Sequence, residues 1–460
     1  MEKKSAAVFE EIRRNVAGID LAWRADNYVC GPRRENGLCE IEPFGTTTRE
    51  LQRMVQWLKE RHVESVAMES TSVYWIPATD LLEANGIEVV LVDAREVRMV
   101  PGRKSDVQDC QWLQKLHSCG LLRGAFRPPE AVAAVRSILR EKETLQAMRT
   151  QAIQQMQKSL DQMNIRVHHA VSDIDGKTGT AIIKAIVEGE RNPARLAALR
   201  DNRCKKSEKE IADHLTGTWR EEHLFNLGQA FKTMQFFDER LAEYDEKASQ
   251  IFSSLAAVAD TPDRLPPPPP LPDKKTTAKE RANAADKANV QQFMGFDLTS
   301  IPGIGYDTAA VISSELGSNL DCFPDESHFA SYIGLAPSLG KSAGKNVRQK
   351  RYKNTSRAGQ ALRMAASTLY RSRTELGAFM QNVARRTDKK TAIKATARRM
   401  AHMIYRGVRY GKEYVDCGAE AYNARLRERT VRTVNRLIKS FNISSSEIAG
   451  AEALATLAAV

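Results

Sequence analysis

Five consecutive prolines, Pro266–Pro270, followed closely by Pro272, are the feature that most constrains how this chain of 460 residues can fold. Proline lacks a backbone N–H and its ring fixes φ, so such a run adopts a stiff polyproline II helix. The run predicts a spacer, although proline-rich segments also serve as docking ligands for aromatic grooves. Together with the Ala- and Lys-rich stretch that follows, which suits either a short solvated helix or disorder, it predicts a linker over residues 261–295.

Residues 14–130, ahead of this linker, are predicted to form an α/β domain. Short apolar runs at 15–22, 65–69 and 87–92 predict buried strands, and helical periodicity over 48–61 and 72–85 predicts helices between them. Two further runs, at 28–30 and 38–41, would complete a three-strand meander with the first. A meander followed by alternating helices and strands predicts a mixed sheet flanked by helices.

Residues 131–260 are predicted to be helical and to carry two long apolar seams. One seam runs from Val132 to Met163, and the other, with heptad spacing, runs from Phe237 to Val258. Packing of two helices within one chain and an intermolecular coiled coil explain these seams equally well. Beyond the linker, residues 296–440 are predicted to form a mostly helical unit, followed by a tail over 441–460.

The net charge of +12 is unevenly distributed along the chain. Residues 338–440 contain 26 Lys and Arg but only 6 Asp and Glu, a net charge of +20, which leaves the remainder at −8. A positive charge of this density would repel itself unless a polyanion neutralised it, so it favours nucleic acid over membrane as the partner. No apolar stretch reaches the ~20 residues of a membrane span. The seven cysteines are scattered without a CxxC pair, which argues against a disulfide framework or a zinc site and favours a reducing cytosol.

Four acidic residues in the α/β domain stand out by position. Asp20 lies in an apolar strand, and Glu69 ends the next one, where ligands bind in open α/β sheets. Asp106 and Asp109 follow the candidate N-cap Ser105 and would share one face of a first helical turn. A turn, an exposed strand end and a helix N-terminus could explain these acids separately. Jointly they favour a site for hard divalent cations such as Mg²⁺ or Mn²⁺.

The mostly helical unit contains two further motifs. Residues 301–305 read Ile-Pro-Gly-Ile-Gly ahead of a helix at 308–316, which predicts a helix-hairpin-helix-like turn whose backbone N–H groups, around Gly303 and Gly305, can hold a phosphate. Further on, Ser342 lies among small residues between Lys341 and Lys345, an electropositive setting that would stabilise an alkoxide or a phosphate. Chemistry alone favours a solvated turn over a nucleophile at this serine.

Taken in order, these motifs resemble insertion-sequence family 110, which includes the Piv-type DNA invertases. The resemblance covers residues 14 to 430 approximately, and it rests on the segments 18–20, 68–72, 104–109, 301–305, 332–337, 342–345 and 362–363. It implies an RNase H/RuvC-like domain in which Asp20, Glu69, Asp106 and Asp109 form a DEDD metal site. It also implies that Ser342 is the nucleophile that forms a covalent phosphoserine link to DNA. The family commonly has Ser-Gly-Gly where this chain has Ser-Ala-Gly at 342–344, and Ser338 is the alternative nucleophile.

The resemblance further implies a DNA transposase or recombinase that acts on donor and target DNA under the guidance of a structured RNA encoded by the element. It implies a homo-oligomer, a dimer or tetramer, with a composite active site, working in the bacterial cytoplasm at the nucleoid. We expect nucleic-acid contacts from Gly303, Gly305, Lys341, Lys345, Arg348, Lys350, Arg351, Lys353, Arg357 and Arg363. The alternative function is a structure-selective nuclease that uses the same carboxylates to hydrolyse DNA.

Overall fold

A mixed five-stranded sheet forms the centre of the N-terminal part of the chain. The computed structural model describes residues 10–22, 25–34, 37–70, 72–93, 106–259, 278–337, 339–342, 345–348, 356–411 and 417–441. The chain divides into two compact units, Met1–Arg127 and Pro128–Val460. The proline run and the tail over 442–460 lie outside the described residues.

The sheet of the first unit has the order β3-β2-β1-β4-β5. Its strands are β1 (Val16–Asp20), β2 (Asn27–Arg33), β3 (Cys39–Phe44), β4 (Ser65–Glu69) and β5 (Glu88–Val92). The first three are antiparallel neighbours, whereas β1, β4 and β5 run parallel. The predicted meander and mixed sheet are confirmed.

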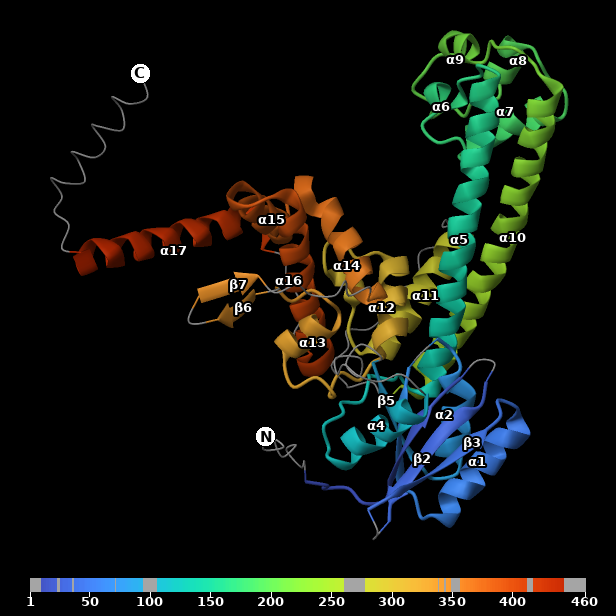
Figure 1. The fold of residues 1–460 in the computed structure, drawn as a ribbon. Coiled ribbons are helices and arrows are strands. Elements are labelled where there is room, and N and C mark those ends of the chain that lie inside the picture. Colours follow the sequence, from blue (N-terminus) through green and yellow to red (C-terminus); the bar gives the residue numbers. More distant parts are fainter. Residues whose placement is uncertain are drawn as a thin grey trace, which may run out of the picture. The chain divides into compact units, whose positions relative to one another are not determined.

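Helices cover both faces of this sheet, namely α1 (Thr48–Glu60), α2 (Trp75–Ala84) and α4 (Asp106–Ser118) (Figure 1). Alternate residues of a strand point to opposite faces. Ala17 and Ile19 of β1 belong to a core that includes Met54 of α1 and Leu82 of α2. The residues that alternate with these two, including Gly18, therefore face α4.

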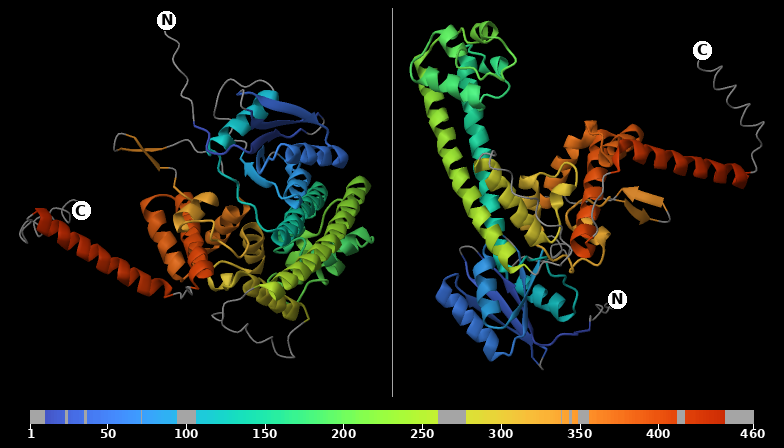
Figure 2. Two further views of the ribbon diagram at one scale, coloured as in Figure 1. Left: turned by 90° about the horizontal axis from the view of Figure 1, so that it is seen from below. Right: turned by 180° about the vertical axis from the view of Figure 1, so that it is seen from behind.

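Two long helices dominate the second unit. They are α5 (Glu130–Gln162) and α10 (Glu221–Val258), which lie side by side within one chain (Figures 1 and 2). Between them in sequence come α6 (Val167–Ala170), α7 (Lys177–Val187), α8 (Pro193–Ala197) and α9 (Glu208–His214), which pack around an apolar core at the tip of the pair. Of the two explanations left open for the apolar seams, the structure shows packing of two helices within one chain.

The seams differ from the prediction in detail. Midway along the pair Met148 is 45% exposed, because two helices alone bury only a narrow stripe. At the end of α10, Phe252 is buried, whereas Val258 is 81% exposed, so the predicted end of the heptad seam is wrong. Phe252 is covered by α11 (Ala278–Met294), whose Phe293 lies 6.2 Å from it between ring centroids. Part of the predicted linker is thus a packed helix.

The remainder of the second unit is mostly helical, as predicted, with one small hairpin. Its elements are η1 (Leu298–Ser300), α12 (Tyr306–Leu316), α13 (Glu326–Tyr332), β6 (Leu339–Ser342), β7 (Lys345–Arg348), α14 (Arg357–Ser367), η2 (Thr368–Arg371), α15 (Glu375–Arg386), α16 (Lys389–Tyr410) and α17 (Gly418–Phe441). None of the helices described here has the length and apolar character that a membrane crossing requires.

A buried ion-pair cluster fastens α5 to α12. Arg140 forms a two-pronged contact with the carboxylate of Glu315, with both N···O distances 2.8 Å. Arg136 donates to the backbone carbonyls of Ser314 and Glu315 at the end of α12. Glu315 is only 8% exposed, so the base of the long hairpin is fixed to this helix through a carboxylate that water hardly reaches.

Candidate active site

The ends of two neighbouring parallel strands carry the first two predicted carboxylates. The register pairs Gly18 with Ala67 and Ile19 with Met68, so the next residues along, Asp20 and Glu69, end their strands side by side. Both are half-buried. Because their side chains alternate with those of Ile19 and Met68, which lie in the core beneath α1 and α2, both carboxylates belong to the face that α4 covers.

Helix α4 lies directly on this face. A Cβ atom added at Gly18 would come 3.0 Å from the Cα of Gln114 and closer still to the carbonyl oxygen of Cys110. At the other end of the sheet, the hydroxyl of Ser65 in β4 lies 2.9 Å from Nε2 of His117. Burial lowers the pKa of His117 to about 4, with the nearby Arg13 cation as the second cause, so this histidine is a neutral hydrogen-bonding partner at pH 7.

These contacts fix the direction of α4. Its last turn lies at the start of β4 and its middle lies over Gly18, so its first turn, with Asp106 and Asp109, lies toward the strand ends that carry Asp20 and Glu69. The distances agree. Asp20 is ~7 Å beyond Gly18 along the strand, and Asp109 and Asp106 are ~5 and ~9 Å beyond the centre of the Cys110–Gln114 turn along the helix. The fold therefore brings the four predicted positions to one end of the sheet.

Oxygen ligands at such a site suit a hard divalent cation. The structure describes Asp20, Glu69 and the half-buried Asp109 with their side chains, but only the backbone at Asp106. Among the side chains that it describes, no group of three acidic, His or Cys residues is already close enough to hold an ion. The backbone arrangement of the four positions fits a DEDD set.

The predicted serine lies in the β6–β7 hairpin, which the sequence did not predict. In the antiparallel register Ser342 pairs with Lys345 and Lys341 pairs with Asn346, so the serine ends its strand at the hairpin loop. Arg348 is the last residue of β7, opposite Leu339. The alternative Ser338 and the cations Lys350, Arg351 and Lys353 lie outside the described residues.

The predicted phosphate-binding turn precedes α12. Gly303 has a φ of 87°, and a Cβ there would lie 2.9 Å from the carbonyl oxygen of Ala365 in α14. This glycine is therefore required for packing as well as for the turn. Gly305 caps α12 with nothing within 4 Å of a Cβ built on it, so the first N–H groups of the helix are open on that side.

The two arginines at the end of the predicted nucleic-acid set belong to α14. Arg357 forms an ion pair with Glu143 of α5, 3.3 Å between Nε and Oε2. Arg363 is half-buried one turn and a half further along the same helix.

Two family models match the chain. Residues 17–165 match a model of IS110-type DEDD transposases, described as "Transposase", and residues 297–381 match one described as "Transposase IS116/IS110/IS902 family". No curated protein matches the chain. The first match contains Asp20, Glu69, Asp106 and Asp109, and a domain of this type implies dependence on a divalent metal ion. The two matches fall on the sheet with α4 and on the turn, hairpin and α14, and together they span just over half of the residues. The chain therefore belongs to the IS110 family of transposases, enzymes that recombine the DNA of insertion elements.

Proposed function

We propose that this transposase cuts and rejoins donor and target DNA through a covalent link to Ser342, with Mg²⁺ or Mn²⁺ held by Asp20, Glu69, Asp106 and Asp109. The observation that carries the metal half of the proposal is the parallel register of β1 and β4, which sets Asp20 beside Glu69 under the first turn of α4. A divalent ion at these carboxylates would neutralise charge that develops on the phosphate.

The residues of the chain supply the remaining chemistry. The hydroxyl of Ser342 attacks a DNA phosphorus in line, a serine–phosphate bond forms, and the bond to the departing deoxyribose oxygen breaks. A carboxylate of the DEDD set takes the proton of the hydroxyl. The phosphodiester energy is conserved in the serine ester, so the strands can be rejoined without ATP. Lys345, opposite Ser342 in the hairpin, and Lys341 before it supply positive charge for the phosphate.

The surroundings of the hairpin support DNA binding by this unit. Residues 338–440 carry a net charge of +20, and the open N-terminus of α12 at Gly305 can receive a phosphate. We expect further phosphate contacts from Arg348, Lys350, Arg351, Lys353 and Arg363. Arg357 contributes less, since Glu143 already offsets its charge.

We further propose a homo-oligomer, a dimer or tetramer, in which the DEDD site of one subunit acts with Ser342 of another. On the two-helix arm, Met148 and Phe236 are 45% and 54% exposed and are candidate contacts for a second copy. A structured RNA of the same element would guide the complex. The protein would act in the bacterial cytoplasm at the nucleoid.

Trapping of a protein–DNA adduct tests the proposed chemistry. Wild-type protein incubated with end-labelled element DNA and Mg²⁺ should give a labelled band that survives denaturation, and Ser342→Ala should abolish it while Ser338→Ala retains it. Asp20→Asn should also abolish the adduct. An adduct that persists in Ser342→Ala would refute the serine assignment. Cleavage without an adduct in any variant would establish hydrolysis instead.

A separate experiment tests the RNA. The protein should co-purify with a discrete transcript from the DNA that flanks its gene, and removal of that transcript by ribonuclease should abolish recombination that added synthetic transcript restores. Unchanged recombination after complete digestion would overturn RNA guidance without touching the adduct result.

A further inference from the structure

Three thiols that lie far apart in the sequence meet between the sheet and α4. Cys30 of β2 pairs with Gly18 of β1, and Gly18 in turn lies against the backbone of Cys110. Cys39, the first residue of β3, lies two residues from Ile41, the partner of Cys30, and so shares its face. The thiols of Cys39 and Cys110 lie close enough to that of Cys30 to raise its pKa. All three are free cysteines.

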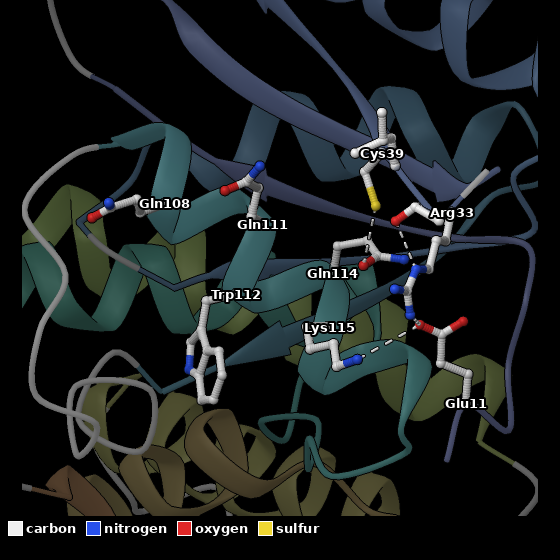
Figure 3. Close-up of a pocket in the computed structure, with 10 residues that line it drawn as sticks. Glu11, Arg33, Cys39, Gln108, Gln111, Trp112, Gln114 and Lys115 are labelled. Atoms are coloured by element: carbon white, nitrogen blue, oxygen red, sulfur yellow. Dashed lines mark hydrogen bonds and ion pairs between the residues drawn. The ribbon is translucent and has the colours of Figure 1, made fainter. Parts of the chain in front are cut away.

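Cys39 opens into a cavity of about 470 Å³ beside α4 (Figure 3). Arg33 and Lys115 line this cavity, and both pair with Glu11, at 3.1 and 3.8 Å. Cys30 and Cys110 are fully buried, whereas Cys39 is only half-buried. Within the cluster, a small solute therefore reaches Cys39 first.

A buried amide also faces this thiol. The side chain of Gln114 is 3% exposed, and its Oε1 lies 3.9 Å from the Sγ of Cys39. Its Nε2 has no hydrogen-bond partner among the described residues. In the thiol form, Cys39 donates to Oε1 of Gln114. A buried N–H donor without an acceptor is costly, and a flip of the amide would turn it toward Cys39, where a thiolate or an oxygen atom added to the sulfur would accept from it.

The electrostatics favour a thiolate at Cys39. A hydrogen bond from Cys30 and the charges of Arg33 and Lys115 lower the pKa of Cys39 to about 7, against the opposing effects of burial and Glu11. The hydrogen bonds with Cys110 and Cys39, together with burial, raise the pKa of Cys30, so Cys30 keeps its proton as the donor of the pair.

We propose that Cys39 is a peroxide-reactive thiol and that Cys30 resolves its oxidised form. The Cys39 thiolate attacks one oxygen of hydrogen peroxide, an S–O bond forms, and the O–O bond breaks. The departing hydroxide takes up the proton that the Cys39 thiol released on ionisation and becomes water. The product is a sulfenic acid at Cys39. The Cys30 thiol then attacks this sulfur, an S–S bond forms, and the sulfenic oxygen leaves as water. Two thiols and one peroxide thus give one disulfide and two waters.

The register predicts that this disulfide is readily reduced. Cys30 and Cys39 are not directly opposed, because Cys39 pairs with Arg33 and a bulge separates that pair from the Cys30–Ile41 pair. Their Cα atoms are therefore farther apart than those of directly opposed residues, whose ~4.5–5.5 Å spacing suits an ordinary disulfide. Closing the bond therefore draws β3 toward β2 and strains it. Strained disulfides have higher reduction potentials, so glutathione should restore both thiols.

Cys322 provides a control within the same chain. The residue is exposed, but its thiol is partly shielded from water, and this desolvation together with the nearby Asp321 raises the pKa of Cys322 above the usual value. If exposure decided reactivity, Cys322 would react first. If thiolate content decides, Cys39 reacts first at pH 7.

The experiment uses the full chain and peptide mass spectrometry after brief treatment with hydrogen peroxide. We expect a Cys30–Cys39 disulfide in the wild-type protein, full recovery of thiols with glutathione, and a dimedone-trapped sulfenic acid at Cys39 in Cys30→Ser. Cys322→Ser should behave as wild type. The rate of iodoacetamide labelling of Cys39 should rise as the pH increases through about 7, because Cys30, Arg33, Glu11 and Lys115 together set the pKa of this thiol there. Oxidation of Cys322 ahead of Cys39, or a Cys39 oxidised without any disulfide in wild type, would overturn the proposal.

Discussion

Replacement of Gly18 by alanine should separate α4 from the strand ends that carry the acidic site. The added Cβ would lie more than 1 Å inside the 3.4 Å at which ordinary contact with the backbone of Cys110 and Gln114 begins. Backbone atoms cannot rotate away as a flexible side chain does, so α4 must retreat by about 1 Å. Overpacking of this kind costs about 1–3 kcal/mol of unfolding free energy.

The effect on catalysis should be larger than the effect on stability. Asp109 moves with α4, whereas Asp20 and Glu69 stay with the sheet, so the carboxylates separate by about the same 1 Å. A misplacement of that size costs about 100-fold in rate. We would measure the free energy of unfolding in urea and the transposition frequency of a marked element, across a range of Mg²⁺ concentrations.

Gly124→Ala is the matched control in the same unit. Its Cβ would make an ordinary contact, 3.8 Å from Cγ1 of Val90, so stability and activity should remain as in wild type. If Gly18→Ala keeps transposition within about twofold of wild type, α4 does not hold the acidic site together and the geometric reasoning fails.

Three other substitutions test the buried polar contacts. Glu315→Gln leaves two arginines of α5 without their carboxylate and should cost about 3–5 kcal/mol in thermal unfolding, whereas Glu428→Gln, on exposed α17, should cost under about 0.5. The pKa of His117 is lower in the folded than in the unfolded chain, so the free energy of unfolding should be full above pH 6.5 and fall by up to about 3 kcal/mol as the pH drops toward 4. Denaturation measured at several pH values should show that His117→Gln removes this loss. Tyr405→Phe should cost only about 1 kcal/mol in urea, because a nearby arginine also donates to the Phe323 carbonyl that the tyrosine hydroxyl contacts.

The strands and their acidic residues were predictable because their signals are local. An aspartate in an apolar run and a glutamate at the end of another identify Asp20 and Glu69 without any knowledge of topology. Their adjacency was not predictable in the same way, since it depends on β4 pairing with β1 after an intervening helix. Gly18 gave a weak signal, because a glycine inside a strand often marks a close approach of another backbone.

Other features left no local trace. The β6–β7 hairpin reads as a loop, because Ser, Ala, Gly and Lys are typical turn residues whether or not strands flank them. Cys30, Cys39 and Cys110 look scattered because their meeting point is created by sheet register and by the packing of α4. A short helix was one of two possibilities for the Ala- and Lys-rich stretch, but the packing of α11 was not predictable, because few of its residues are apolar and one of them, Phe293, faces α10.

The antiparallel pairing of α5 and α10 has a consequence for how this arm can change length over evolution. A residue added to one helix alone would shift its apolar stripe against that of the other, so insertions must occur as matched pairs on both sides of the tip. The smallest pair that keeps the stripe in phase is close to a heptad in each helix, which moves the tip by ~10 Å. Relatives with arms of different reach should therefore differ in discrete steps, each visible in the sequence as two compensating insertions.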